Sequence, residues 1–399
     1  MPSIPHPFPK PDFSDTATAF AAKTDAQVEK AFWLFRAMNM PWLTGPGSAV
    51  LNWALKMHLP VQGIIKSTVF EQFCGGETIE ECEKAVNNIG SRGVGTILDF
   101  SAEGEKTEAA FDAIAAETLA TIERAAKSEY IPFGVFKLSG LARFALLEKM
   151  QSGASLSADE RTEFARAEAR VERICGRAEE LGIRILIDGE ETWIQDVIDN
   201  LCYRMMQLFN QDRCIVYNTF QMYRTESLQN LKTAAAQAKA GGYYFGAKPV
   251  RGAYMEKERA RAARLGYADP IQPDKPASDR DYDAALLFCL DNIDRISLCA
   301  GTHNEASCML LVNEMERRKI APNDKRIYFS QLYGMSDNIS FNLAKAGFNV
   351  AKYLPYGPVA LVMPYLIRRA NENTSVAGQS SREFQLIAKE RWRRKKARA

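Results

Sequence analysis

Short apolar runs rich in β-branched and aromatic residues alternate with longer amphipathic stretches over most of the chain. Such runs, ending in polar residues or glycine, predict buried strands, and their alternation with helices predicts a parallel sheet. The predicted strands are 96–100, 134–139, 183–188, 214–220, 243–248, 296–300, 327–332 and 350–354. The predicted helices are 107–126, 158–180, 192–208, 226–240, 281–293, 305–317, 337–346 and 359–372. Eight strand–helix units close naturally into a (β/α)8 TIM-like barrel, which is the predicted fold class.

An open, doubly wound α/β sheet is the alternative because it uses the same βα repeat. That fold often carries a GxGxxG turn after its first strand, and none follows 96–100. Prolines punctuate the first part of the chain on both sides of a predicted helix at 25–38. We therefore expect an N-terminal helical arm (1–65), a barrel (66–380) and a basic C-terminal helical tail (381–399).

Composition places the chain among globular proteins. Its 399 residues are 46% hydrophobic and 25% charged, and 51 basic residues against 49 acidic ones leave a net charge of only +2. This balance gives no global field that favours nucleic acid, and we expect no nucleic-acid partner. The eight cysteines form no CxxC pair and do not cluster with the three histidines, so we expect no metal site and a reducing, intracellular environment. We also expect neither a secretion signal nor a membrane span.

Polar side chains stand at the ends of the predicted strands, where a barrel of this kind forms its active site. They are Asp99, Lys137, Asp188, Glu190, Asn218, Gln221, Lys248, Arg251, Thr302, His303, Asn304, Gln331, Tyr333 and Tyr353. Any one of them could simply solvate the rim of the barrel. Together they are rich in lysine, arginine, aspartate and amide groups, which favours a ligand site.

The last predicted barrel helix contains a compact charged constellation. Arg368 and Arg369 lie three or four residues after Tyr365 and three or four before Glu372, so all four side chains can share one face. Two guanidinium groups with one carboxylate to orient them form a fork suited to a ligand carboxylate or phosphate. An ordinary solvated ion pair is the alternative at this position.

A series of motifs in one order makes the chain resemble the monofunctional proline dehydrogenases. They are ILD at 97–99, FKLS at 136–139, PVRGAY at 249–254, GTHN at 301–304, QLYG at 331–334, YLPYG at 353–357 and YLIRR at 365–369. The resemblance runs from about residue 66 to 380. It implies a distorted (β/α)8 barrel that holds FAD at its mouth, oxidises L-proline to Δ1-pyrroline-5-carboxylate and passes the electrons to a membrane quinone.

The resemblance also implies roles for individual residues. Asp99 and Lys248 would act beside the reacting atoms. The substrate-binding set would be Lys66, Ala253, Leu332, Tyr353, Tyr365, Arg368, Arg369 and Glu372. The flavin would be lined by Asn218, Gln221, Lys248, Arg251, Gly252, Ala253, Tyr254, Thr302 and His303. Tyr353 favours proline over hydroxyproline, because related hydroxyproline oxidases tend to have a smaller residue there.

Three other functions remain open from the sequence. The first is hydroxyproline oxidation on the same fold. The second is a flavin-free lyase or aldolase that uses Lys137 or Lys248 as a Schiff-base lysine. The third is a barrel without catalysis that binds proline-like carboxylates through Arg368 and Arg369.

The C-terminal segment 382–399 has eight basic and two acidic residues, a local charge of +6, with apolar residues interleaved. This pattern is typical of a basic amphipathic helix that lies on an anionic membrane, although a solvated tail would look the same. We expect a cytoplasmic protein with peripheral contact at the inner face of the membrane, or one on the matrix side of the mitochondrion if its source is eukaryotic.

Overall fold

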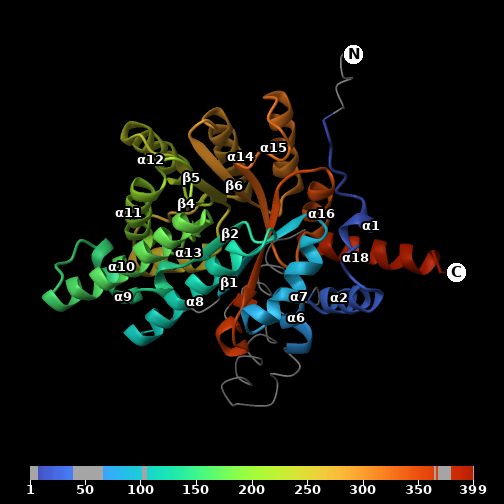
Figure 1. Cartoon of the computed structure of the whole chain (residues 1–399), viewed down its shortest axis with the longest axis horizontal. Helices are drawn as coiled ribbons and strands as arrows, with labels where there is room; N and C mark the ends of the chain where they lie inside the picture. Colours follow the sequence, from blue (N-terminus) through green and yellow to red (C-terminus); the bar gives the residue numbers. More distant parts are fainter. Residues whose placement is uncertain (1–7, 39–65, 101–105, 364, 367–378, 399) are drawn as a thin grey trace.

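The computed structural model describes residues 8–38, 66–100, 106–363, 365–366 and 379–398. Its centre is a closed barrel of parallel strands in the order β1 to β8, with helices arranged around it (Figure 1). The strands are β1 (Val94–Phe100), β2 (Phe133–Phe136), β3 (Arg184–Ile187), β4 (Val216–Gln221), β5 (Phe245–Val250), β6 (Ile296–Gly301), β7 (Ile327–Leu332) and β8 (Val350–Tyr356). The predicted barrel is therefore confirmed, and the open-sheet alternative is wrong because β1 pairs with β8 along its whole length.

The helices that connect successive strands form the outer layer of the barrel. They are α8 (Glu108–Ala126), α10 (Ala158–Leu181), α11 (Thr192–Phe209), α12 (Ser227–Gly241), α14 (Lys275–Asp291), α15 (Glu305–Arg317) and α16 (Asp337–Lys345). Further helices precede the barrel or are inserted into its connections: α1 (Thr16–Ala19), α2 (Asp25–Met38), η1 (Lys66–Phe70), α6 (Glu71–Phe73), α7 (Ile79–Gly90), η2 (Leu138–Gly140), α9 (Phe144–Gln151) and α13 (Met255–Leu265). After β8, residues 359–363 and 365–366 are helical, and α18 (Gln379–Lys396) closes the chain.

Local sequence signals set the ends of the long helix α10. Ser157 accepts a hydrogen bond from the Glu160 N–H, and the Glu160 carboxylate accepts one from the Ser157 N–H, which completes a capping box. At the other end Gly182 adopts φ 68°, a left-handed conformation that glycine takes without steric cost. The chain can then turn directly into β3.

The interior of the barrel is filled by alternate residues of the strands. Phe133 from β2 stacks edge-on against Tyr217 and Tyr328, with ring centroids 5.5 Å and 4.9 Å away. The same buried cluster contains Ile97, Leu186, Cys299, Ala351 and Tyr353. Because successive side chains of a strand point to opposite faces, this alternation decides which polar residues of a strand reach the inside of the barrel.

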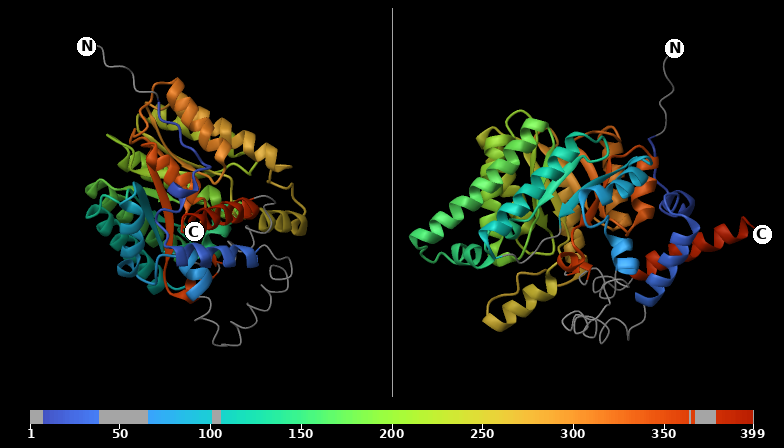
Figure 2. Two further views of the ribbon diagram at one scale, coloured as in Figure 1. Left: turned by 90° about the vertical axis from the view of Figure 1, so that its right-hand side faces the viewer. Right: turned by 60° about the horizontal axis from the view of Figure 1, so that its bottom comes forward.

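The C-terminal helix α18 packs against α2 of the N-terminal arm, and the two lie side by side in both views of Figure 2. Arg391 pairs with Glu29 at 2.6 Å, and the rings of Phe32 and Phe384 lie 5.1 Å apart. Leu386 and Ile387 are buried in this contact, at 3% and 2% exposure. The predicted basic helix is confirmed, but its apolar side faces the arm and is not available to a membrane in this arrangement.

Among the described residues, no helix combines the length and the low polarity that crossing a bilayer requires.

Candidate functional site

Lys248, Asp188 and Tyr353 meet at the carboxyl-terminal mouth of the barrel. The Lys248 ammonium donates to Asp188 Oδ1 at 2.5 Å and to the Tyr353 hydroxyl, and that hydroxyl donates to the same carboxylate oxygen at 3.2 Å. The Lys248 and Asp188 side chains are 6% and 14% exposed. Burial, followed by the negative charge of Asp188, raises the pKa of Tyr353 well above 10, so the phenol stays protonated. These three residues place an ammonium and a carboxylate in fixed positions at the mouth, beside the aromatic ring of Tyr353.

A second lysine and a second aspartate extend the triad. Lys137 Nζ, from the residue before η2, lies 3.9 Å from Asp99 Oδ1 and 4.0 Å from Asp188 Oδ2. Two ammonium groups and two carboxylates therefore alternate across the ends of β1, β2, β3 and β5, and Tyr353 of β8 contacts Lys248 and Asp188 among them. Of the residues assigned to the site from the sequence, the structure brings Asp99, Lys248 and Tyr353 together.

From the sequence, Asp188 was predicted only as a polar residue of the rim, and Lys137 was given a role only in the alternative lyase, as a Schiff-base lysine. Lys137 contacts carboxylates at the ends of the neighbouring strands β1 and β3, and Asp188 also contacts Lys248 of β5. These residues are far apart along the chain, so no local spacing reveals the contacts. The only sign of a site role in the sequence is that both residues stand at the ends of predicted strands. Many other polar residues of the barrel rim share that position, so it does not single these two out.

The predicted flavin-contact loop after β5 is anchored by Arg251. Its Nε donates to Asp279 at 2.6 Å, Nη1 to the Thr302 hydroxyl at 2.8 Å and Nη2 to the Ser307 hydroxyl at 2.9 Å. The guanidinium also lies over the Tyr282 ring, 4.3 Å from its centroid. The hydrogen bonds of Arg251 thus hold the start of the loop in place, and Thr302 accepts one of them.

Gly252 follows Arg251 at the surface of the mouth. Its φ is 121°, and a Cβ at this position would lie 2.4 Å from Cδ1 of Tyr223. Only glycine satisfies both conditions, so the backbone here can approach a flat ligand closely. Gly252 and the following Ala253 are both exposed, and Tyr254 ends the loop as the residue before α13.

His303, after β6, is held in one orientation. Its Nε2 accepts the Leu332 N–H at 3.4 Å, so we assign the ring hydrogen to Nδ1, which lies 2.9 Å from the Ser336 hydroxyl. Ser336 has φ 50°, and its own N–H donates to Glu383 of α18. Burial raises the pKa of Glu383 to about 7. The C-terminal helix thus supports a residue of the predicted flavin site.

The two amides of β4 face different ways. Gln221 lies toward the mouth, and its amide donates to the Glu190 carbonyl at 2.7 Å. Asn218 lies on the other face of the strand and donates to Asp199 of α11 at 2.9 Å. In the ladder Lys248 pairs with Thr219, one residue away, so the structure does not bring Asn218 together with Lys248.

The remaining substrate residues from the sequence are only partly described. Arg368, Arg369, Glu372 and the side chain of Lys66 lie outside the described residues. Tyr365 is 7% exposed and belongs to a cluster different from that of Tyr353. Leu332 packs against both clusters and links them.

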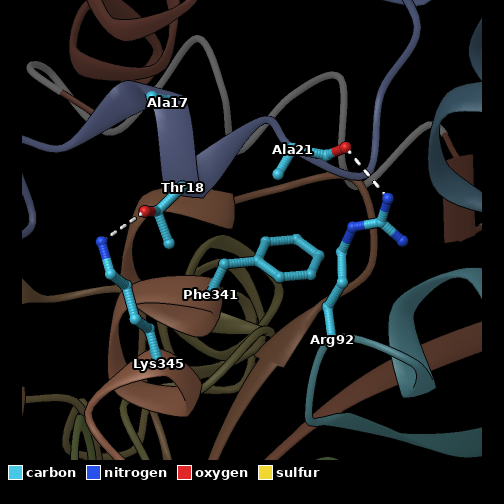
Figure 3. A pocket seen from close by; sticks show the side chains of 6 residues that line it. All are labelled: Ala17, Thr18, Ala21, Arg92, Phe341 and Lys345. Carbon is cyan, nitrogen blue, oxygen red and sulfur yellow. Dashed lines mark hydrogen bonds between the residues drawn. The ribbon is translucent and has the colours of Figure 1, made fainter.

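A surface pocket of about 330 Å³ lies apart from the mouth (Figure 3). It is lined by residues of α16 and by Arg92, which precedes β1. Its two cations are engaged by the protein: Lys345 binds Asp15 at 3.0 Å and Thr18 at 2.9 Å, and Arg92 binds the Ala21 carbonyl at 3.2 Å. It therefore offers no uncommitted charge to a ligand, and we assign the site to the mouth.

Comparison with known proteins agrees with the geometry. The sequence profile of the family described as "Proline dehydrogenase" matches residues 82–382. The chain belongs to the proline dehydrogenase family. The resemblance drawn from the motifs is thus confirmed over the barrel.

The chain is also similar to individual curated proteins. "Proline dehydrogenase 1, mitochondrial" of Caenorhabditis elegans is 41% identical over 245 residues, which are 60% of this chain and 40% of that protein. "Carbapenem antibiotics biosynthesis protein CarD" of Pectobacterium carotovorum subsp. carotovorum is 34% identical over 333 residues, 84% of this chain and 86% of the relative. The chain thus spans less than half of the nematode protein but most of CarD.

Solved structures support the fold. Proline utilization A (PutA) from Bdellovibrio bacteriovorus, inactivated by N-propargylglycine, superposes with a TM-score of 0.67 at 19% identity, covering 91% of this chain and 38% of that one. At this identity the likeness speaks for the barrel architecture alone.

Proposed function

We propose that this family member oxidises L-proline to Δ1-pyrroline-5-carboxylate with FAD at the barrel mouth and passes the electrons to a quinone. The observation that carries the proposal is the buried cluster of Lys248, Asp188, Tyr353, Lys137 and Asp99 at the mouth of a barrel that belongs to the proline dehydrogenase family.

The groups at the mouth suit a flavin. Lys248 would supply positive charge, and Gln221 an amide, beside the redox-active ring. The loop Arg251 to Tyr254 would lie along the cofactor, because Gly252 leaves its backbone open to close approach. Thr302 and His303, with Ala253, complete the predicted contacts. Asn218 would act on the flavin only through its support of the strand, since its amide is bound to α11. When bound, FAD supplies the two-electron acceptor.

The protein's own part is to orient the substrate and to set its protonation. Arg368 and Arg369, oriented by Glu372, would clamp the carboxylate, while Tyr353 and Tyr365 would wall the ring. Removal of hydrogen from the carbon beside nitrogen requires a neutral amine, whereas free proline carries an ammonium near neutral pH. The mouth cations lower the pKa of that ammonium and the aspartates oppose them.

Tyr353 also bears on the choice of substrate. Its hydroxyl is fixed by Lys248 and Asp188, so the ring cannot swing away without breaking two buried hydrogen bonds. A ring hydroxyl on the substrate would have to fit against this fixed wall. We therefore propose proline and not hydroxyproline as the substrate, and comparable turnover of trans-4-hydroxyproline and L-proline would contradict this choice.

A Schiff-base lyase is less well supported. Lys248 forms an ion pair with Asp188, and the ammonium group of such a pair has no lone pair with which to attack a carbonyl. The Lys137 ammonium lies 3.9 Å from an oxygen of Asp99 and 4.0 Å from an oxygen of Asp188. Both lysines are arranged to hold charge.

The absorption spectrum of the purified protein tests the proposal. We expect a flavin spectrum that bleaches when L-proline is added without oxygen. A colourless protein that is still folded would contradict flavin chemistry. A coloured protein that binds proline without bleaching would contradict catalysis and favour a binding module.

We further propose a quinone as acceptor and a peripheral position at the cytoplasmic face of a bacterial membrane, or on the matrix side in a mitochondrion. Mitochondrial relatives support the second setting. Because the apolar side of α18 is covered by α2, contact with lipid would use the basic end of α18 and the exposed Trp392. Liposome sedimentation of the chain without residues 388–399 tests this: unchanged sedimentation would contradict the membrane contact.

A further inference from the structure

Glu190 is a buried carboxylate beside the mouth to which no role was assigned from the sequence. It lies in the connection from β3 to α11, two residues after Asp188, and is 3% exposed. Its carboxylate accepts two hydrogen bonds from one residue: the Ser139 N–H donates to Oε1 at 2.9 Å, and the Ser139 hydroxyl donates to Oε2. Ser139 belongs to η2, the turn that follows Lys137. The contact thus joins the ends of β2 and β3.

The backbone of Glu190 holds a second part of the mouth. Its carbonyl accepts the Gln221 amide at 2.7 Å, and its N–H donates to the Gln195 side chain at 2.9 Å. Gln195 in turn donates to Asp199 at 2.8 Å, the same carboxylate that binds Asn218. Three strand ends therefore meet at this one residue.

We propose that Glu190 is a positioning residue, whose carboxylate fixes the turn that carries Lys137 and whose main chain fixes the amide of Gln221. The inference rests on the proposed function, because that function gives Lys137 and Gln221 roles at the mouth. Lys137 Nζ must lie between Asp99 and Asp188 at about 4 Å from each, and η2 sets its backbone only two residues before Ser139. Loss of the Ser139 contacts would free the turn and let the ammonium move.

Glu190 also adds charge that depends on pH. Burial raises its pKa to about 7, and the Ser139 hydrogen bonds and the charge of Lys137 limit the rise. Below that pH the mouth loses a negative charge near Lys137, and above it the charge returns. The charged groups around it come from every neighbouring element: Lys137 before η2, Asp188 and Glu191 in the same connection, Asp199 of α11 through Gln195, and Lys257 of α13 through Glu191.

The chain offers a matched control in the next residue. Glu191 is also buried, at 4% exposure, but its carboxylate pairs with Lys257 of α13. Glu190→Gln and Glu191→Gln remove the same charge one residue apart with little change of shape. Only the first replaces one of the two oxygens that accept hydrogen bonds from Ser139 by an NH2 group, which cannot accept.

Infrared spectroscopy tests the titration without using activity. Burial raises the pKa of Glu383 to about 7 as well, so the background for this test is the Glu383→Gln holoprotein, in which we expect a protonated carboxyl band that disappears with a midpoint near pH 7. Glu190→Gln should abolish the band. Glu191→Gln should keep it and move its midpoint to lower pH, because the Glu191 charge helps to raise the pKa of Glu190. A band that survives when Glu190→Gln is added to the Glu383→Gln background, or the absence of any such band in that background, would overturn the assignment.

Kinetics test the positioning. We expect Glu190→Gln to remove an inflection near pH 7 from kcat/KM for proline, whereas Glu191→Gln keeps it. Glu190→Ala should lower kcat about 10- to 100-fold, the range expected when a catalytic group is displaced by about 1 Å. If that variant does not fold, Glu190→Gln carries the test alone. A merely structural Glu190 would lower the melting temperature in Glu190→Ala while the pH profile of Glu190→Gln matched the wild type, and that result would overturn the proposal. A wild type that bleaches no flavin with proline would instead contradict the proposed function, and the infrared titration would still decide the state of Glu190.

Discussion

Replacing Lys248 by methionine tests the buried charge cluster at the mouth. Lys248 and Asp188 are 6% and 14% exposed, and the substitution leaves the Asp188 carboxylate without its closest cation. Breaking a buried ion pair by removing one partner typically costs 3–5 kcal/mol, whereas an exposed pair is worth about 0–1 kcal/mol. Because Lys137 remains 4.0 Å from the other Asp188 oxygen, we expect the lower end, about 3 kcal/mol.

Urea unfolding of the purified protein measures this loss, and two further variants make the result specific. Lys345→Met breaks an exposed pair with Asp15, where the lysine is 63% exposed, and should cost less than about 1 kcal/mol. The double variant Lys248→Met/Asp188→Asn removes the orphaned charge and should be less destabilised than the two single variants added together, by roughly 1–3 kcal/mol. If Lys248→Met cost no more than Lys345→Met, or the double variant were additive, the buried pair would not hold the mouth as described.

Three other outcomes follow from the site. Gly252→Ala should lower the flavin content of the purified protein, because the new Cβ would meet Tyr223 at a φ of 121°, and unchanged flavin absorbance per protein would contradict this. Folding stability, from urea unfolding, should fall as the pH rises from about 4.5 to about 7, since the folded state binds protons more tightly than the unfolded chain at Glu190 and Glu383, by at most about 1.4 kcal/mol per pH unit for each group. A Glu383→Gln variant with the wild-type slope would exclude that residue as a source. Arg368→Met should weaken apparent proline affinity about 10- to 150-fold, the loss of a charge-assisted contact worth about 1.5–3 kcal/mol, and an unchanged KM would leave it a surface ion pair.

The barrel could be predicted because each strand carries its own signal. The run 350–354 predicted β8, and the structure extends it only to Tyr356. Buried parallel strands are continuous apolar runs with polar ends, so their number and order survive errors of a few residues at their ends. Insertions such as α13 were missed, because that helix is mostly charged and exposed and so lacks a clear apolar stripe.

The contents of the site were harder to predict than its position. Strand ends located the mouth, but the choice of face depends on register: Asn218 and Gln221 look alike in the sequence, and only the ladder places them on opposite sides of β4. Contacts such as that of Ser139 with Glu190 join residues 51 positions apart. The apolar half of the C-terminal helix was assigned to lipid because its partner, α2, lies at the other end of the chain.

A crystal structure of the flavin-loaded protein with L-proline is the most direct measurement of the central claim. We predict the substrate carboxylate between the guanidinium groups of Arg368 and Arg369, with its ring against Tyr353 and the flavin over the mouth beside Lys248. Those two arginines turned into solvent, with the flavin or the proline bound away from the mouth, would contradict it.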